Sequence, residues 1–165
     1  MTLFSRRTPA FSALLIAALA FATIADAWGY QWAGYLPCDL CLEQRYAYYA
    51  GVPLALLIAA AAAAKAPRAL ISAGFGLLAA IFLYNAGLAV YHSGVEAKLW
   101  AGPTACTGSG ISGGGDLLKQ LQTVRVVRCD EVSVRLFGLS LANWNIAISA
   151  ALAALAAATA LRKGR

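Results

Sequence analysis

Residues 69–91, ALISAGFGLLAAIFLYNAGLAVY, contain no charged side chain and indicate the fold class of this chain. A helix rises about 1.5 Å per residue, so about 20 apolar residues cross a hydrocarbon core roughly 30 Å thick. This stretch is long enough to do so. Because no water reaches the backbone inside a bilayer, a spanning segment must satisfy its own amide groups, and this favours a helix.

Three further charge-free runs share this character. Hydrophobic residues make up 61% of the 165-residue chain and charged residues only 12%, compared with roughly 25% charged in soluble proteins. We therefore predict an all-α membrane protein, a four-transmembrane-helix bundle that forms a single domain over residues 1–165. The expected spans are about 8–27, 46–64, 69–91 and 138–161, with outer loops at about 28–45 and 92–137.

The basic residues predict the orientation of these spans. One end of the predicted bundle carries no acidic residue and has Arg6, Arg7, Lys65, Arg68, Arg162, Lys163 and Arg165. The other end holds all seven acidic residues of the chain. The positive-inside rule therefore places both termini in the cytoplasm and both larger loops outside. The net charge of +6 does not predict nucleic-acid binding, because the basic residues form no stripe interleaved with aromatics.

The first run also has a competing interpretation. Arg6 and Arg7, the apolar stretch after them and the A-x-A pattern at residues 25–27 resemble a secretory signal with a cleavage site. Cleavage there would leave three spans. It would not move the later loops to the other side of the membrane.

The four cysteines all fall in the predicted outer loops. Cys38 and Cys41 belong to the stretch PCDLCLEQR at residues 37–45, and Cys106 and Cys129 lie in the second loop. In an oxidising compartment this distribution suggests one disulfide in each loop. Two alternatives remain open from the residues alone. One is a non-catalytic membrane scaffold with two structural disulfides, and the other is a metal-binding membrane protein with cysteine ligands.

The C-x-x-C pair favours redox chemistry over a structural staple. Closing so small a ring removes little entropy from the unfolded chain, whereas this spacing is common in reversible dithiol switches. We expect Asp39 to cap a helix that begins at Leu40 and continues into the second span. Cys41 then lies in the first helical turn, where free N–H groups and the helix dipole stabilise a thiolate.

Two cationic or titratable side chains are expected near this pair. Arg45 stands four residues after Cys41 and therefore on the same helix face, where its charge favours the thiolate. His92 is the only histidine of the chain and falls at the outer end of the third span. In the second loop, the glycine-rich residues 108–115 predict a mobile segment, and residues 116–127 predict a short amphipathic helix on the membrane surface.

The four spans, PCDLCLEQR in the first outer loop and the later cysteine pair together resemble the DsbB family, the disulfide bond formation proteins of the bacterial inner membrane. The resemblance covers nearly the whole chain. The related vitamin K epoxide reductases place their C-x-x-C late in the chain, whereas here it comes first. One difference is Gln44, which stands where some family members carry glutamate.

The resemblance implies a function for each of these residues. Cys38 and Cys41 would deliver electrons to a membrane quinone, ubiquinone or menaquinone. Cys106 and Cys129 would accept them from a reduced DsbA-like periplasmic thiol oxidase, with Cys106 forming the mixed disulfide. Arg45 and His92 would lie at the quinone. The implied activity is that of a quinone-dependent protein thiol oxidoreductase, with no resident metal.

Overall fold

The computed structural model describes residues 9–103 and 128–162. Within them the elements follow the order α1 (Pro9–Trp32), α2 (Asp39–Ala63), α3 (Arg68–Glu96), β1 (Arg135–Leu136), β2 (Leu139–Ser140) and α5 (Leu141–Ala160). All four of these helices are long and apolar enough to cross a membrane. The prediction of a four-helix membrane bundle is therefore confirmed.

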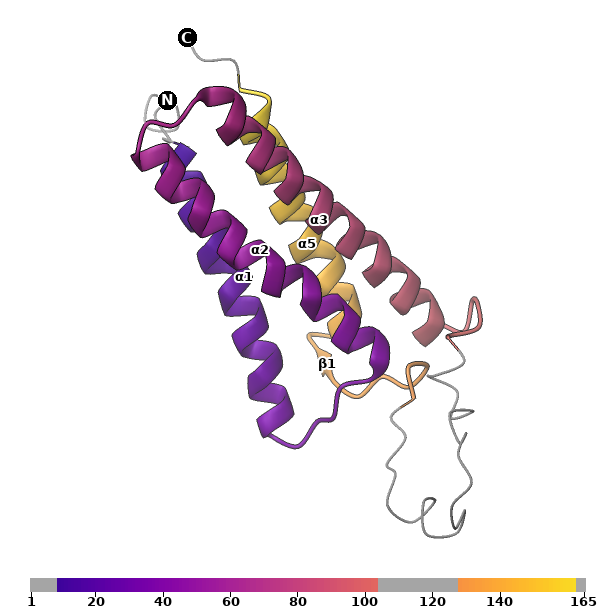
Figure 1. The fold of residues 1–165 in the computed structure, drawn as a ribbon. Coiled ribbons are helices and arrows are strands. Elements are labelled where there is room, and N and C mark those ends of the chain that lie inside the picture. The colour runs from indigo at the N-terminus through magenta and orange to yellow at the C-terminus, as the bar shows by residue number, and fades with distance from the viewer. Residues whose placement is uncertain (1–8, 104–127, 163–165) are drawn as a thin grey trace, which may run out of the picture.

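The helices alternate in direction, so the two ends of the bundle carry different connections and helix ends (Figure 1). The start of α1, the tight α2–α3 turn and the end of α5 lie together at one end. At that end Arg68 donates a hydrogen bond to the backbone oxygen of Arg162 and ties α3 to the chain after α5. The α1–α2 connection and the β1–β2 hairpin lie at the opposite end. That end also carries the C-x-x-C pair.

Close helix packing depends on small residues where two helices approach. A Cβ atom added at Gly51 would lie 2.6 Å from Cζ of Phe82, and one added at Gly74 would lie 2.8 Å from Cγ1 of Ile58. A larger residue at either position would therefore displace the facing Phe82 or Ile58 side chain or push α2 and α3 apart. Membrane helices commonly associate in this way, because van der Waals packing replaces the hydrophobic effect inside lipid. The buried core includes Ile16, Ile58, Phe75, Leu78, Phe82 and Leu152.

The helices extend beyond the predicted spans at the cysteine end. Helix α1 continues to Trp32, α2 already begins at Asp39, and α3 ends only at Glu96. Residues 33–38 therefore connect α1 to α2, and the helix ends on either side of them fall within the predicted outer loop. The structure also corrects the expected N-cap of α2. Cys38 rather than Asp39 is the cap, because its backbone is extended and its sulfur accepts a hydrogen bond from the amide of Cys41 at 3.3 Å.

A tight hairpin precedes the last helix. Strands β1 and β2 pair antiparallel, and the two residues between them, Phe137 and Gly138, both have positive φ, 52° and 83°. Such a two-residue turn matches the twist of the flanking strands. Ser140 then caps α5 by accepting a hydrogen bond from the amide of Asn143 at 3.3 Å. The predictions for residues 108–115 and 116–127 lie outside the described residues.

Candidate functional site

The C-x-x-C pair lies at the N-terminus of α2, as the sequence predicts for Cys41. Both cysteines are free thiols in this structure, and their sulfur atoms are 2.9 Å apart. Cys38 is buried, whereas Cys41 is partly buried. Because Cys41 occupies the first turn of α2, it lies among the free N–H groups at the positive end of the helix dipole.

The two thiols have different protonation preferences. The Cys38 thiol donates a hydrogen bond to the sulfur of Cys41. This hydrogen bond and burial raise the pKa of the Cys38 thiol. A proton shared by the pair is therefore favoured on Cys38.

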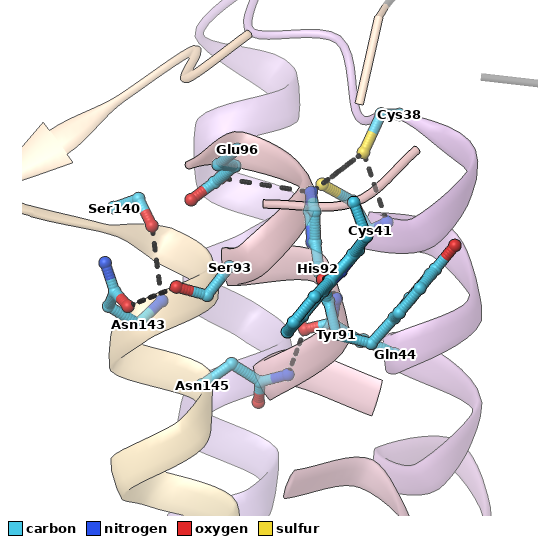
Figure 2. Close-up of polar contacts among 11 residues, drawn as sticks. Cys38, Cys41, Gln44, Tyr91, His92, Ser93, Glu96, Ser140, Asn143 and Asn145 are labelled. Atoms are coloured by element: carbon cyan, nitrogen blue, oxygen red, sulfur yellow. Dashed lines mark hydrogen bonds and ion pairs between the residues drawn. The ribbon is translucent and has the colours of Figure 1, made fainter. Parts of the chain in front are cut away.

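Helix α3 places His92 beside the cysteine pair. Its Nε2 lies 3.6 Å from the sulfur of Cys38 and 3.9 Å from a carboxylate oxygen of Glu96. Its Nδ1 lies 2.8 Å from Nε2 of Gln44. Figure 2 shows the imidazole between the two cysteines and Glu96. The sequence placed His92 at the outer end of the third span, but it did not predict contact with Cys38.

Arg45 lies on α2 and reaches back to α1. It donates hydrogen bonds from Nη1 to the side-chain oxygen of Gln31 at 2.6 Å and from Nη2 to the backbone oxygen of Ala27 at 3.2 Å. Its Nε is buried and has no hydrogen-bond partner among the residues that the structure describes. No carboxylate is bonded to this guanidinium there, so its charge and one donor are available to an acceptor. A buried charged donor left unpaired costs more than an ordinary missing hydrogen bond.

A cavity of about 150 Å³ joins these groups. Cys41, Arg45 and His92 all line it, as do Tyr48 and Asn145. Apolar and aromatic side chains complete the wall, among them Ile24, Tyr30, Tyr35, Leu36, Leu141, Trp144 and Ile148. An apolar pocket with a few converging polar groups is typical of small-molecule sites.

A set of polar side chains extends from the cavity into the bundle, and our sequence analysis missed it. Gln44, Tyr48, Asn85, Asn145 and Ser149 are joined by hydrogen bonds across α2, α3 and α5. The available signal was the position of amide and hydroxyl side chains inside apolar spans, where polar groups are costly and mark functional sites. Sequence spacing alone could not show that they meet.

The second cysteine pair is described in part. Cys129 is 1% exposed and is disulfide-bonded. It packs in a small buried cluster with Cys38, Leu40 and Val95, against which Cys41 also rests. Cys106 lies outside the described residues. The fold therefore brings Cys129 to the C-x-x-C pair, although the sequence separates them by most of two helices and a loop.

The same site has some features of a metal centre. The ligand atoms of Cys38, Cys41 and His92 lie within 4.8 Å of one another, and two cysteines with one histidine can bind zinc. A metal-bound histidine, however, usually donates its other ring N–H to an acceptor. Here Nδ1 of His92 faces the amide nitrogen of Gln44, which is a donor. The contacts around His92 therefore suit thiol chemistry better than metal binding.

Comparison with known proteins identifies a protein family. The family model described as disulfide bond formation protein DsbB matches residues 8–159 of this chain. The matched range contains α1, α2 and α3, all of α5 except Ala160, and all four cysteines. No curated protein and no solved structure matches the chain.

Proposed function

This chain belongs to the DsbB family of disulfide bond formation proteins, and we propose that it is a quinone-dependent protein thiol oxidoreductase. In this proposal it reoxidises a DsbA-like periplasmic thiol oxidase and passes the electrons to a membrane quinone. The observation that carries the proposal is the cavity lined by Cys41, Arg45 and His92 together. A redox-active sulfur, a cation and an imidazole thus line the same small-molecule site.

The proposed electron route uses two thiol–disulfide exchanges. A dithiol of the soluble oxidase reduces the Cys106–Cys129 disulfide and becomes a disulfide itself. The resulting Cys106 and Cys129 thiols then reduce the Cys38–Cys41 disulfide. Each exchange moves two electrons, and in each the attacking group is a thiolate. Packing of Cys129 against Cys38 in one buried cluster supports the second exchange.

The last acceptor in the proposal is ubiquinone or menaquinone, and a bound quinone would supply an acceptor for two electrons and two protons. Oxidation of the Cys38 and Cys41 thiols to a disulfide releases the same number of each. The residues around the cavity fit such a molecule. Quinone oxygens are acceptors, and Arg45 has a buried Nε–H without a partner among the described residues. Cys41 lines the cavity from the end of the helix that favours thiolate.

We further propose that this multi-pass membrane protein lies in the bacterial inner membrane with both termini in the cytoplasm. Lys65, Arg68 and Arg162 support this orientation, because they lie at the end of the bundle opposite the cysteines. By the positive-inside rule that end faces the cytoplasm. The cysteine pairs then face the periplasm, where disulfides persist.

The proposal is tested with purified protein, a reduced DsbA-like thiol oxidase, and ubiquinone or menaquinone analogues. We expect one quinone to be reduced for each disulfide formed in the oxidase. The Cys38→Ala variant serves as the control for non-enzymatic oxidation. Folded protein that reduces neither quinone with any such oxidase would contradict the proposal and favour a scaffold with structural disulfides.

A further inference from the structure

A continuous chain of hydrogen bonds connects the middle of the bundle to Cys38. Helix α2 contributes Gln44 and Tyr48, α3 contributes Asn85 and His92, and α5 contributes Asn145. These polar side chains are buried or partly buried. Inside a bilayer each amide must find both a donor and an acceptor. The orientation of one amide therefore determines the orientation of the next.

The hydrogen bonds farthest from Cys38 set the orientation of the Asn145 amide. Its Oδ1 accepts hydrogen bonds from the hydroxyl of Tyr48, from Oγ of Ser149 at 3.1 Å, and from Nδ2 of Asn85 at 3.4 Å. Turning the Asn145 amide over would place its NH₂ group against the NH₂ group of Asn85. With Oδ1 facing these donors, Nδ2 of Asn145 donates to Oε1 of Gln44 (Figure 2).

Asn145 in turn sets the orientation of Gln44. Because Oε1 of Gln44 accepts from Asn145, its Nε2 is the atom that faces Nδ1 of His92, at 2.8 Å. An amide nitrogen can only donate, so Nδ1 must accept with its lone pair. The other ring nitrogen, Nε2, faces acceptors, the sulfur of Cys38 and the carboxylate of Glu96. Both sides of the ring therefore require the proton on Nε2.

We propose that Gln44 is a positioning residue that holds His92 in the tautomer with its proton on Nε2, directed at Cys38. In the opposite tautomer, two N–H donors would face each other across 2.8 Å, and Cys38 would face a lone pair. A mismatch of one buried hydrogen bond shifts such an equilibrium by about tenfold or more. The consequence for catalysis rests on the proposed function: His92 offers an N–H to the Cys38 sulfur whenever that sulfur carries charge.

The single histidine makes this proposal directly measurable. Protein labelled with ¹⁵N-histidine and purified without a histidine tag gives ring signals from His92 alone. Spectra of the reduced protein are recorded in detergent at about pH 8, above the ordinary titration range of histidine. We expect the wild-type protein to show a protonated Nε2 and an unprotonated Nδ1. A proton on Nδ1 would overturn the proposal.

Three substitutions test the series of hydrogen bonds that orients Gln44 and, through it, His92. Gln44→Glu keeps the shape but turns the donor into an acceptor, so we expect Nδ1 to become protonated in this variant. Asn145→Leu removes the hydrogen bond that orients the amide of Gln44. We therefore expect the ratio of the Nε2-protonated to the Nδ1-protonated tautomer of His92 to fall about tenfold. Asn143→Leu is the matched control, because it removes another polar contact between α5 and α3, that of Asn143 with Ser93. It should leave the His92 spectrum unchanged.

The outcomes separate this proposal from the proposed function. The spectra need neither quinone nor a partner protein, so the tautomer is measured even if no turnover is found. If Nδ1 stays unprotonated in Gln44→Glu and the tautomer ratio is unchanged in Asn145→Leu, Gln44 does not set the tautomer. If Asn143→Leu shifts the spectrum as much as Asn145→Leu, general loosening of the α3–α5 contact explains the effect and the proposal fails. Gln44→Glu is close in size to the wild type and remains informative if the leucine variant does not accumulate.

Discussion

The sulfur of Cys38 lies 3.6 Å from Nε2 of His92, although 54 positions separate the two residues along the chain. Cys38 caps α2 and His92 belongs to the last turns of α3. Their contact places an imidazole beside the C-x-x-C pair at one end of a membrane bundle. Both residues also adjoin Cys41, which lines the cavity.

Replacing Cys38 or Cys41 by alanine should abolish quinone reduction and leave the protein folded. The reason is that the pair contributes little as a staple, and loss of the Cys38 cap removes one hydrogen bond worth about 1 kcal/mol. Quinone reduction is followed by absorbance, and folding by gel filtration and circular dichroism in detergent. Variants that fail to accumulate in the membrane would instead support a structural role for the pair.

Cys129→Ala should allow a mixed disulfide between Cys106 and the soluble oxidase to be trapped. Without Cys129, the thiol of Cys106 has no partner in its own loop to resolve the intermolecular bond. A heavier species on a non-reducing gel, removed by dithiothreitol, reports the complex. The double variant Cys106→Ala/Cys129→Ala is the control and should give no such species. Trapping by the double variant would identify a different entry point for the electrons.

Arg45→Ala should raise the apparent KM for quinone by about 10- to 100-fold, the range expected for a hydrogen bond to a charged group. Arg45→Lys keeps the charge but loses the planar set of donors, so its KM should rise less. One stoichiometric round of oxidation of the soluble partner by the oxidised protein should survive both substitutions.

The matched control for Arg45 is Gln31→Leu. It removes the hydrogen bond between Gln31 and Nη1 of Arg45 but keeps the guanidinium. Its KM should therefore stay close to the wild-type value. An equal rise in KM for Gln31→Leu and Arg45→Ala would mean that Arg45 acts by tying α1 to α2. Unchanged quinone kinetics in Arg45→Ala would place the quinone elsewhere.

The alkylation rate of Cys38 in the reduced protein should keep rising with pH beyond the pH range in which an ordinary cysteine titrates. The hydrogen bond to Cys41 and burial raise the pKa of the Cys38 thiol, and only the thiolate reacts. The sign for stability follows: the stabilising effect of the neutral Cys38 thiol is present below the ordinary cysteine pKa and is lost as pH rises above it. Mass spectrometry of briefly alkylated protein gives the rate at each pH, with denatured protein as reference. A Cys38 profile equal to that of the denatured protein would contradict the expected shift.

The amino-acid sequence was sufficient for the features that depend on local composition and spacing. Charge-free runs predicted the four helices, because a bilayer admits a long apolar segment mainly as a helix. The C-x-x-C spacing put Cys41 in the first turn of α2, and an interval of four residues put Arg45 on the same face. The N-cap of α2, however, was not predicted correctly. The sulfur of Cys38, not the carboxylate of Asp39, caps the helix, because the backbone leaves its extended conformation one residue earlier than expected.

The tertiary structure alone decided which distant residues meet. His92 reaches Cys38, and Cys129 packs beside it, only because α3 ends and the chain returns toward α5 at the same end of the bundle as the start of α2. Gln44 and Asn145 likewise meet only because α2 and α5 both pack against α3. Apolar runs carry no information about helix rotation or depth, since lipid and helix interior are equally apolar. Those two quantities are set by small residues such as Gly51 and Gly74 and by the buried hydrogen bonds themselves.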